Sequence, residues 1–344
     1  MTEQFVSASL VAIWSAMGVY TVAFILFTLD LAKRSAGDAE SAGSTADSSS
    51  TAESLAFERA AASESSSGRS IGGQLGNAGG ITATLVRPVE DSPAPKVYRL
   101  ERVAFALTGL AWLVHVAAVL LRGFAQGYVP WANMFEFSLT SSAIIVGVFL
   151  FMQFWQNLRF LGAYISGFAL IVLGVGTVNF YVDVVPLAVP LQSFWLVIHV
   201  FVAVLGTAFF ALGAGLSITQ LLQSRAAAGR AVGLRFLQTI PSADKLETLA
   251  YRVIVVGFVF WTFTLIAGAV WAERAWGRYW GWDTKEVWTF IIWTIFAGYI
   301  HARATRGWRG SRSAWLAIIG FGAVMFNFTV VNLFFKGLHA YSGL

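Results

Sequence analysis

Apolar runs of membrane-spanning length recur along the chain and are separated by short polar segments. A helix needs about 20 apolar residues to cross the hydrocarbon core of a bilayer. Backbone in lipid must satisfy its own hydrogen bonds, which a helix does. The pattern therefore predicts an all-α, polytopic membrane helix bundle with about eight transmembrane helices. The predicted spans are 5–31, 99–121, 134–154, 158–180, 194–222, 249–271, 288–305 and 314–336.

The first apolar run has the length of a signal peptide as well as that of a membrane anchor. Glu3 precedes it at the place where a signal peptide carries basic residues, and Lys33 and Arg34 follow it. We therefore expect residues 1–34 to be an uncleaved N-terminal transmembrane anchor.

The segment 35–97 differs from the rest of the chain because Ser, Ala and Gly dominate it, as in "SAGSTADSSSTAES". Such a segment has too little apolar surface to bury to offset the entropy cost of ordering. We expect a disordered cytoplasmic loop, and a spacer is favoured over a function of its own. Residues 98–344 then form the main membrane domain, with an outer loop at 272–288.

Composition and charge support this organisation. The chain is 57% hydrophobic and 12% charged, whereas soluble proteins carry about 25% charged residues. The absence of cysteine excludes disulfides and thiol chemistry by this chain itself. Cytoplasmic loops carry an excess of Lys and Arg, which places the N-terminus and the loop at 272–288 outside. Only five of the 23 Lys and Arg then lie outside: Arg122, Arg274, Arg278, Lys285 and Lys336.

The outer loop contains "WGRYWGWDTKEVW" at residues 276–288. Tryptophans near a membrane surface usually form an interfacial belt, and an acid such as Asp283 often opens a helix. A belt does not require the glycines between the rings, which let a flat group approach the backbone. Arg278 and Lys285 add cations that can pair with carboxylates. The combination favours a large, flat, anionic ligand such as a porphyrin with two propionates.

The chain has four histidines, and histidine is the usual axial ligand of porphyrin iron. His199 lies near the outer end of the fifth span, and His339 follows the eighth. Either one alone is more simply explained by a hydrogen bond, but together with the Trp-rich loop they favour a ligand pair. His301, near the inner end of the seventh span, is a functional candidate or a snorkelling interfacial residue. For His115, a hydrogen bond between helices is favoured over ligation.

The stretch "WGRYWGWDTKEVW", followed by "AGYIHARATRGWRG", resembles the WWD domain of haem-handling proteins. From about residue 99 onward the chain is similar to the CcsA family, also called ResC, of system II cytochrome c biogenesis. "VPWANMFEFSLTSS" resembles the Pro-x-x-Asn-x-x-Glu element of that family. Thr284 and Val287 depart from its usual proline and threonine. The loss of the proline removes a rigid helix start but no ligand contact.

The resemblance implies roles for the candidate residues. His199 and His339 match the two external histidines that ligate haem iron. His301 matches a transmembrane histidine proposed to hold haem nearer the cytoplasm, with a second axial ligand from a partner protein. His115 matches no assigned role, and no catalytic residue separable from haem binding is implied. The haem-binding motif is matched by Trp276, Gly277, Trp280, Trp282 and Asp283.

The resemblance also implies a function: a membrane subunit of the cytochrome c synthase, or haem lyase, complex in the cytoplasmic membrane. Such a subunit carries haem b to the outer face and holds it for thioether attachment to the Cys-x-x-Cys-His segment of apocytochrome c. The implied partners are a ResB-type membrane protein, the apocytochrome and a thioredoxin-like thiol reductant, because this chain has no cysteine. No nucleic acid is expected among the partners.

Three alternatives stay open at this point. A b-type haem electron-transfer subunit needs histidine pairs at matched depths, whereas His115 and His301 are predicted at opposite depths. A solute transporter with an aromatic outer gate often shows internal repeats, and no clear repeat is visible in the sequence. A scaffold would bind partner proteins without any haem.

Overall fold

The computed structural model describes residues 2–64, 99–229, 234–305, 307–335 and 337–339, and the described chain is built of helices. The long helices are α1 (Thr2–Glu64), α2 (Arg99–Gln126), α3 (Met134–Met152), α4 (Gly162–Asn179), α5 (Phe194–Ala227), α6 (Ala243–Trp276), α7 (Thr284–Ala304) and α8 (Ser311–Phe326). The short elements are η1 (Arg159–Leu161), η2 (Val189–Leu191), η3 (Arg235–Thr239), the π-helical segment η4 (Asn327–Val331) and α9 (Asn332–Phe334).

Each predicted span falls on one of the long helices, and the spans 158–180 and 314–336 also include short elements, η1 in the first and η4 with α9 in the second. Seven helices within the described part of the chain are long and apolar enough to cross a membrane, which confirms a multi-pass membrane protein. The seventh predicted span lies on α7, which is not one of the seven. The Trp and Thr side chains of α7, together with His301 and Arg303, make this helix less apolar than the others.

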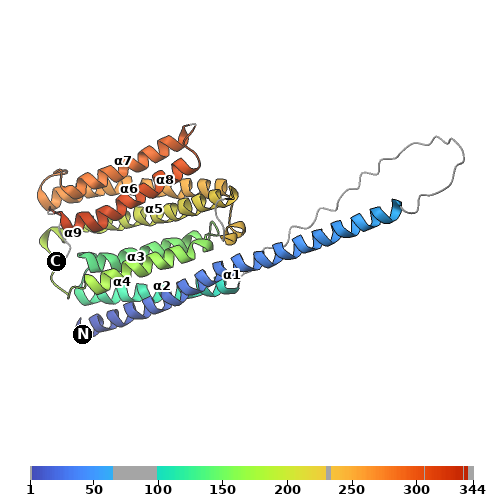
Figure 1. The fold of residues 1–344 in the computed structure, drawn as a ribbon. Coiled ribbons are helices and arrows are strands. Elements are labelled where there is room, and N and C mark those ends of the chain that lie inside the picture. Colours follow the sequence, from blue (N-terminus) through green and yellow to red (C-terminus); the bar gives the residue numbers. More distant parts are fainter. Residues whose placement is uncertain (1, 65–98, 230–233, 306, 336, 340–344) are drawn as a thin grey trace.

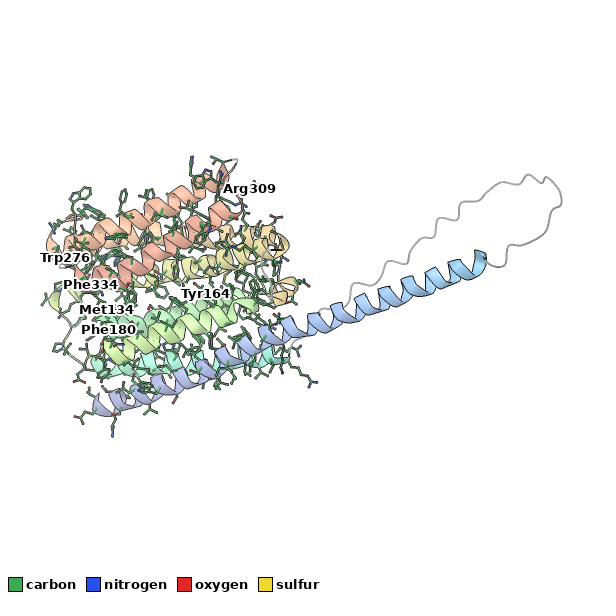
Figure 2. The ribbon with its side chains drawn as sticks, viewed as in Figure 1. Met134, Tyr164, Phe180, Trp276, Arg309 and Phe334 are labelled. Carbon is green, nitrogen blue, oxygen red and sulfur yellow. The ribbon has the colours of Figure 1, made fainter. Side chains whose placement is uncertain are left out.

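The helices form two groups that lie side by side (Figure 1), α1 to α4 in one and α5 to α8 in the other. Contacts between α3 and α5 join the two groups. Trp276 lies at the same end of the bundle as the N-terminus, and Arg309 lies at the opposite end (Figure 2). This arrangement agrees with the predicted topology, in which the N-terminus and the loop at 272–288 share one side of the membrane.

The structure differs from the sequence-based expectation after the predicted anchor. We expected disorder from residue 35, but α1 continues as a helix to Glu64 and projects beyond the bundle (Figure 1). Ala, the commonest residue in 35–64, is the best helix former, and an existing helix extends without the cost of a new nucleus. The remainder of the predicted loop, 65–97, lies outside the described residues.

The helices α5 and α6 approach each other closely because small residues line their interface. A Cβ atom on Gly206 would lie 3.3 Å from the carbonyl oxygen of Gly257, and a Cβ on Gly213 would collide with the Ile254 side chain. Small residues at such crossings are typical of membrane helices. The close crossing brings a side chain of α5 within hydrogen-bond reach of the α6 backbone, which matters for His199.

A buried ion pair fixes the start of α3. Arg122 Nη2 lies 3.0 Å from Glu136 Oε1, and both side chains are 1% exposed. Arg122 also donates to the Val182 carbonyl oxygen at 2.7 Å, which ties the segment after α4 to the same point. Asn133 caps α3 by accepting from the Glu136 backbone N–H at 2.9 Å. The asparagine and glutamate of the "VPWANMFEFSLTSS" element thus have clear structural roles.

Candidate functional site

A cavity of about 220 Å³ opens between the two groups of helices, near the loop that joins α6 to α7. Side chains from α3 to α8 and from this loop line it. His199, Trp280 and His339 are among the lining residues, whereas His115 and His301 are not. The structure therefore brings both predicted outer histidines and one motif tryptophan to a single space.

His199, in the second turn of α5, is held by the backbone of α6. Its Nδ1 lies 3.0 Å from the Thr264 carbonyl oxygen, and because a carbonyl can only accept, Nδ1 carries the proton. The neutral ring then keeps its lone pair on Nε2. Gly268 makes room for the ring, since a Cβ at that position would lie 2.8 Å from His199 Cε1.

His339, which follows α9, is held by the carboxylate that opens α7. Its Nδ1 lies 2.8 Å from Asp283 Oδ2. The hydrogen bond from His339 lowers the pKa of the Asp283 carboxyl, which keeps it ionised at neutral pH. An ionised carboxylate only accepts, so Nδ1 donates, and a neutral ring leaves Nε2 free. A histidine that donates its other ring nitrogen to a carboxylate or carbonyl is the usual arrangement of a metal ligand.

Trp271 links the two histidines. Its ring stacks on His199 with centroids 5.8 Å apart and meets His339 edge-on at 5.5 Å. The ring is 2% exposed, and its Nε1 donates to the Pro190 carbonyl oxygen at 3.0 Å. Trp271 was not among the predicted site residues because it lies at the end of an apolar span. The sequence signal for Trp271 is that it lies in the same helix as Trp276, shortly before the motif.

The motif residues divide between the cavity and its rim. Trp276 packs edge-on against His339 at 4.8 Å. Gly277 ends α6 with a φ of 68°, a left-handed conformation that favours glycine. Trp280 lines the cavity and meets Trp282 at right angles, 5.8 Å between centroids. Trp282 itself is 77% exposed, has a φ of 58° and does not line the cavity.

Asp283 and Glu286 shape the loop through backbone contacts. Asp283 is the N-cap of α7, and with Glu286 it forms a capping box, which confirms the expected capping role. Glu286 Oε2 accepts from the backbone N–H groups of Gly281 at 2.8 Å and Asp283 at 3.0 Å. Asp283 Oδ1 accepts from the Leu338 backbone N–H at 3.0 Å. One carboxylate therefore connects the helix start to the C-terminal segment.

The other two histidines lie elsewhere. His301 is exposed in the last turn of α7, at the end of that helix opposite the loop. His115 is buried, and its Nε2 lies 2.9 Å from the Leu139 carbonyl oxygen, with the Tyr20 hydroxyl 3.5 Å from Nδ1. The interpretation of His115 as a hydrogen bond between helices is confirmed.

The ligand set restricts what the cavity can hold. Within the part of the chain that the structure describes, no group of three or more His, Cys, Asp or Glu could bind a metal ion. A metal ion such as zinc takes three or four protein ligands, so two imidazole nitrogens alone are too few to hold it. They suit an iron that brings its own in-plane ligands, as in a porphyrin.

Comparison with known proteins relates the chain to cytochrome c assembly. Residues 100–339 match the family described as Cytochrome C assembly protein. The chain is also similar to curated proteins named cytochrome c biogenesis protein CcsA. The relative from Guillardia theta is 33% identical over 268 residues, which cover 72% of this chain and 88% of the relative. The one from Porphyra purpurea is 31% identical over 303 residues, 77% of this chain and 95% of the relative.

Proposed function

Because this chain belongs to the cytochrome c assembly protein family, and so has a role in cytochrome c maturation, we propose that it carries haem to the outer face of the cytoplasmic membrane. There it holds haem b, as the substrate, for covalent attachment to apocytochrome c. His199 and His339 are the axial ligands of the haem iron. The relatives are named cytochrome c biogenesis proteins, and the cavity brings the two histidines to one space.

One observation carries this proposal: both outer histidines line the same cavity and both have Nδ1 engaged by a protein acceptor. Each ring then has Nε2 left for iron. Trp271 and Trp276 pack against these rings and limit their rotation. Trp280 offers an aromatic plane at the cavity wall, which suits one face of a flat macrocycle.

The attachment itself is thiol addition to the vinyl groups of haem. Each cysteine S–H of the Cys-x-x-Cys-His segment adds across one C=C bond, so that one S–C and one C–H bond form with no net oxidation. The histidine of the same segment then replaces one axial ligand. The protein holds the iron and positions the ring, while the haem supplies the reactive groups.

The chemistry implies partners that this chain does not replace. The apocytochrome thiols must be reduced, and the chain contains no cysteine, so a thioredoxin-like reductant acts on the apocytochrome. His301 is exposed near the inner end of α7. There it holds haem before transfer, with the second axial ligand supplied by a ResB-type membrane partner. An exposed histidine leaves room for such a ligand from outside the chain.

We expect Asp283→Asn to weaken haem binding by about 10- to 100-fold, the usual cost of losing the outer partner of a metal-ligating histidine. Asparagine caps helices as well as aspartate does, so α7 keeps its start while His339 loses its anionic acceptor. Titration of the purified protein with haemin, followed by Soret absorbance, measures the change. Asp244→Asn, at an exposed acid in the first turn of α6, is the matched control. An unchanged affinity in Asp283→Asn would remove Asp283 from the site.

The experiment that tests the proposed function is an absorption spectrum of the wild-type protein purified with its membrane partner. We expect the Soret and α bands of low-spin haem with two histidine ligands. A wild-type protein without haem, but with vectorial uptake of another solute, would favour a transporter. Absence of both haem and transport would favour a scaffold. A b-type electron-transfer subunit is disfavoured because both ring nitrogens of His115 have partners inside the bundle, the Leu139 carbonyl oxygen and the Tyr20 hydroxyl.

A further inference from the structure

One part of the cavity wall is polar, although most of the wall is apolar. Lys285, from the first turn of α7, lines the cavity together with Asn327 of η4 and Asn332 of α9. Lys285 Nζ donates to Asn332 Oδ1. Lys285 lies far from the two asparagines in the sequence, and its ammonium group meets the Asn332 amide only in the folded chain.

The π-helical segment η4 accounts for the position of the two asparagines. In an α-helix, residues five apart point in clearly different directions, whereas a π-turn brings residues i and i+5 onto one side. Asn327 and Asn332 are five residues apart across η4, and both line the cavity. Single π-turns within α-helices are frequent at functional sites.

Asn327 lacks a partner that a buried amide normally has. It is 8% exposed, and its Oδ1 has no hydrogen-bond partner among the residues that the structure describes. Buried polar groups are almost always hydrogen-bonded. An amide carries both a donor and an acceptor, which exchange places when it turns by 180°. The side chain therefore has unused hydrogen-bonding capacity that faces the cavity.

Lys285 likewise has unused capacity. An ammonium group has three donors, and the hydrogen bond to Asn332 uses one of them. Among the described residues, no carboxylate lies within ion-pair distance of the Lys285 ammonium. Glu286 lines the same cavity, but its Oε2 is engaged by the backbone N–H groups of Gly281 and Asp283. A cation on a mostly apolar wall without a carboxylate partner suits an anionic ligand.

We propose that Lys285, together with Asn327 and Asn332, binds the propionate carboxylates of the haem whose iron is held by His199 and His339. This inference rests on the proposed haem site and adds the orientation of the ring within it. The two propionates lie on one edge of haem and the two vinyl groups on the opposite edge. With the propionate edge at Lys285, the vinyl groups point away from it and stay free for the apocytochrome thiols.

The test compares haemin with haemin dimethyl ester, in which both carboxylates are masked and the ring and vinyl groups are unchanged. Both are titrated into the purified wild-type protein in the same detergent, and the ratio of the two dissociation constants is measured. We expect the wild type to bind haemin at least about tenfold more tightly than the ester. The reason is that the ester loses at least one charge-assisted hydrogen bond. In Lys285→Met the ratio falls to about one.

Two further variants keep this test decisive. Lys285→Gln retains a donor for Asn332 and serves if Lys285→Met does not fold; it also has a ratio near one. Arg278→Gln removes the cation of the segment between α6 and α7, which is exposed and does not line the cavity, and it keeps the wild-type ratio. A ratio that is lost in Arg278→Gln and retained in both Lys285 variants would overturn the proposal.

Failure of this inference is distinguishable from failure of the proposed function. If wild-type protein gives the low-spin spectrum of two histidine ligands with both porphyrins and binds them equally, the haem site stands and the propionate site is wrong. If neither porphyrin gives that spectrum, the haem site itself is wrong, and the propionate site fails with it.

Discussion

The double variant His199→Ala, His339→Ala is expected to abolish cytochrome c maturation. Both rings line the cavity with Nε2 available, and iron left without protein ligands has nothing to hold its position or spin state. Haem-stained gels of membranes measure covalent haem on c-type cytochromes, and immunodetection of the variant confirms that it is present in the membrane. The purified double variant should also lack the low-spin spectrum.

Added imidazole provides the control for the double variant. A small imidazole can occupy the space of a deleted ring and ligate iron, so partial recovery of maturation is expected if ligation is the lost property. Normal maturation in the double variant without imidazole would exclude both histidines as required ligands. Haem that remains in the double variant would point to a second site at His301.

Glu136→Ala is expected to destabilise the protein by about 3–5 kcal/mol, the usual effect of removing one partner of a buried ion pair. The Arg122 guanidinium, 1% exposed, would remain in the bundle without its carboxylate. Thermal unfolding in detergent, followed by circular dichroism or by loss of the monodisperse peak, measures the effect.

The matched comparison for Glu136→Ala is the double variant Arg122→Met, Glu136→Leu. It removes both charges and should be closer to wild type than Glu136→Ala, because no unpaired charge remains. If Glu136→Ala is as stable as wild type, the Val182 carbonyl oxygen alone satisfies the guanidinium, and the pair does not fix the start of α3.

The helices and the loop between α6 and α7 could be predicted from sequence because their signals are local. Apolar runs predicted the spans, and Asp283 predicted a helix start, which the structure shows as a capping box with Glu286. The partners of the histidines could not be predicted in this way. Thr264 and Gly268 are apolar-span residues of α6, and they contact His199 only because α5 and α6 cross closely. Periodicity indicates which face is buried but not which residue lies opposite.

The π-helical segment η4 was equally invisible in the sequence, because nothing in "MFNFTVVNLF" distinguishes a π-turn from an α-helical turn. Its effect is to place Asn327 and Asn332 on one side, where the cavity lies. Helix propensities and apolar periodicity assume the α-helical repeat, and a single wider turn changes every face that follows. Lys285 was expected as a cation for a carboxylate, but the two asparagines beside it in the cavity wall were not.

The position of the Asp283 carboxylate leaves no room for a side chain at Gly337. Its carboxylate caps α7, accepts from His339 and accepts from the Leu338 amide. A Cβ atom at Gly337 would lie 3.0 Å from the Asp283 carboxylate carbon. A side chain at position 337 would therefore press on the carboxylate that holds His339, although positions 283 and 337 lie far apart in the chain.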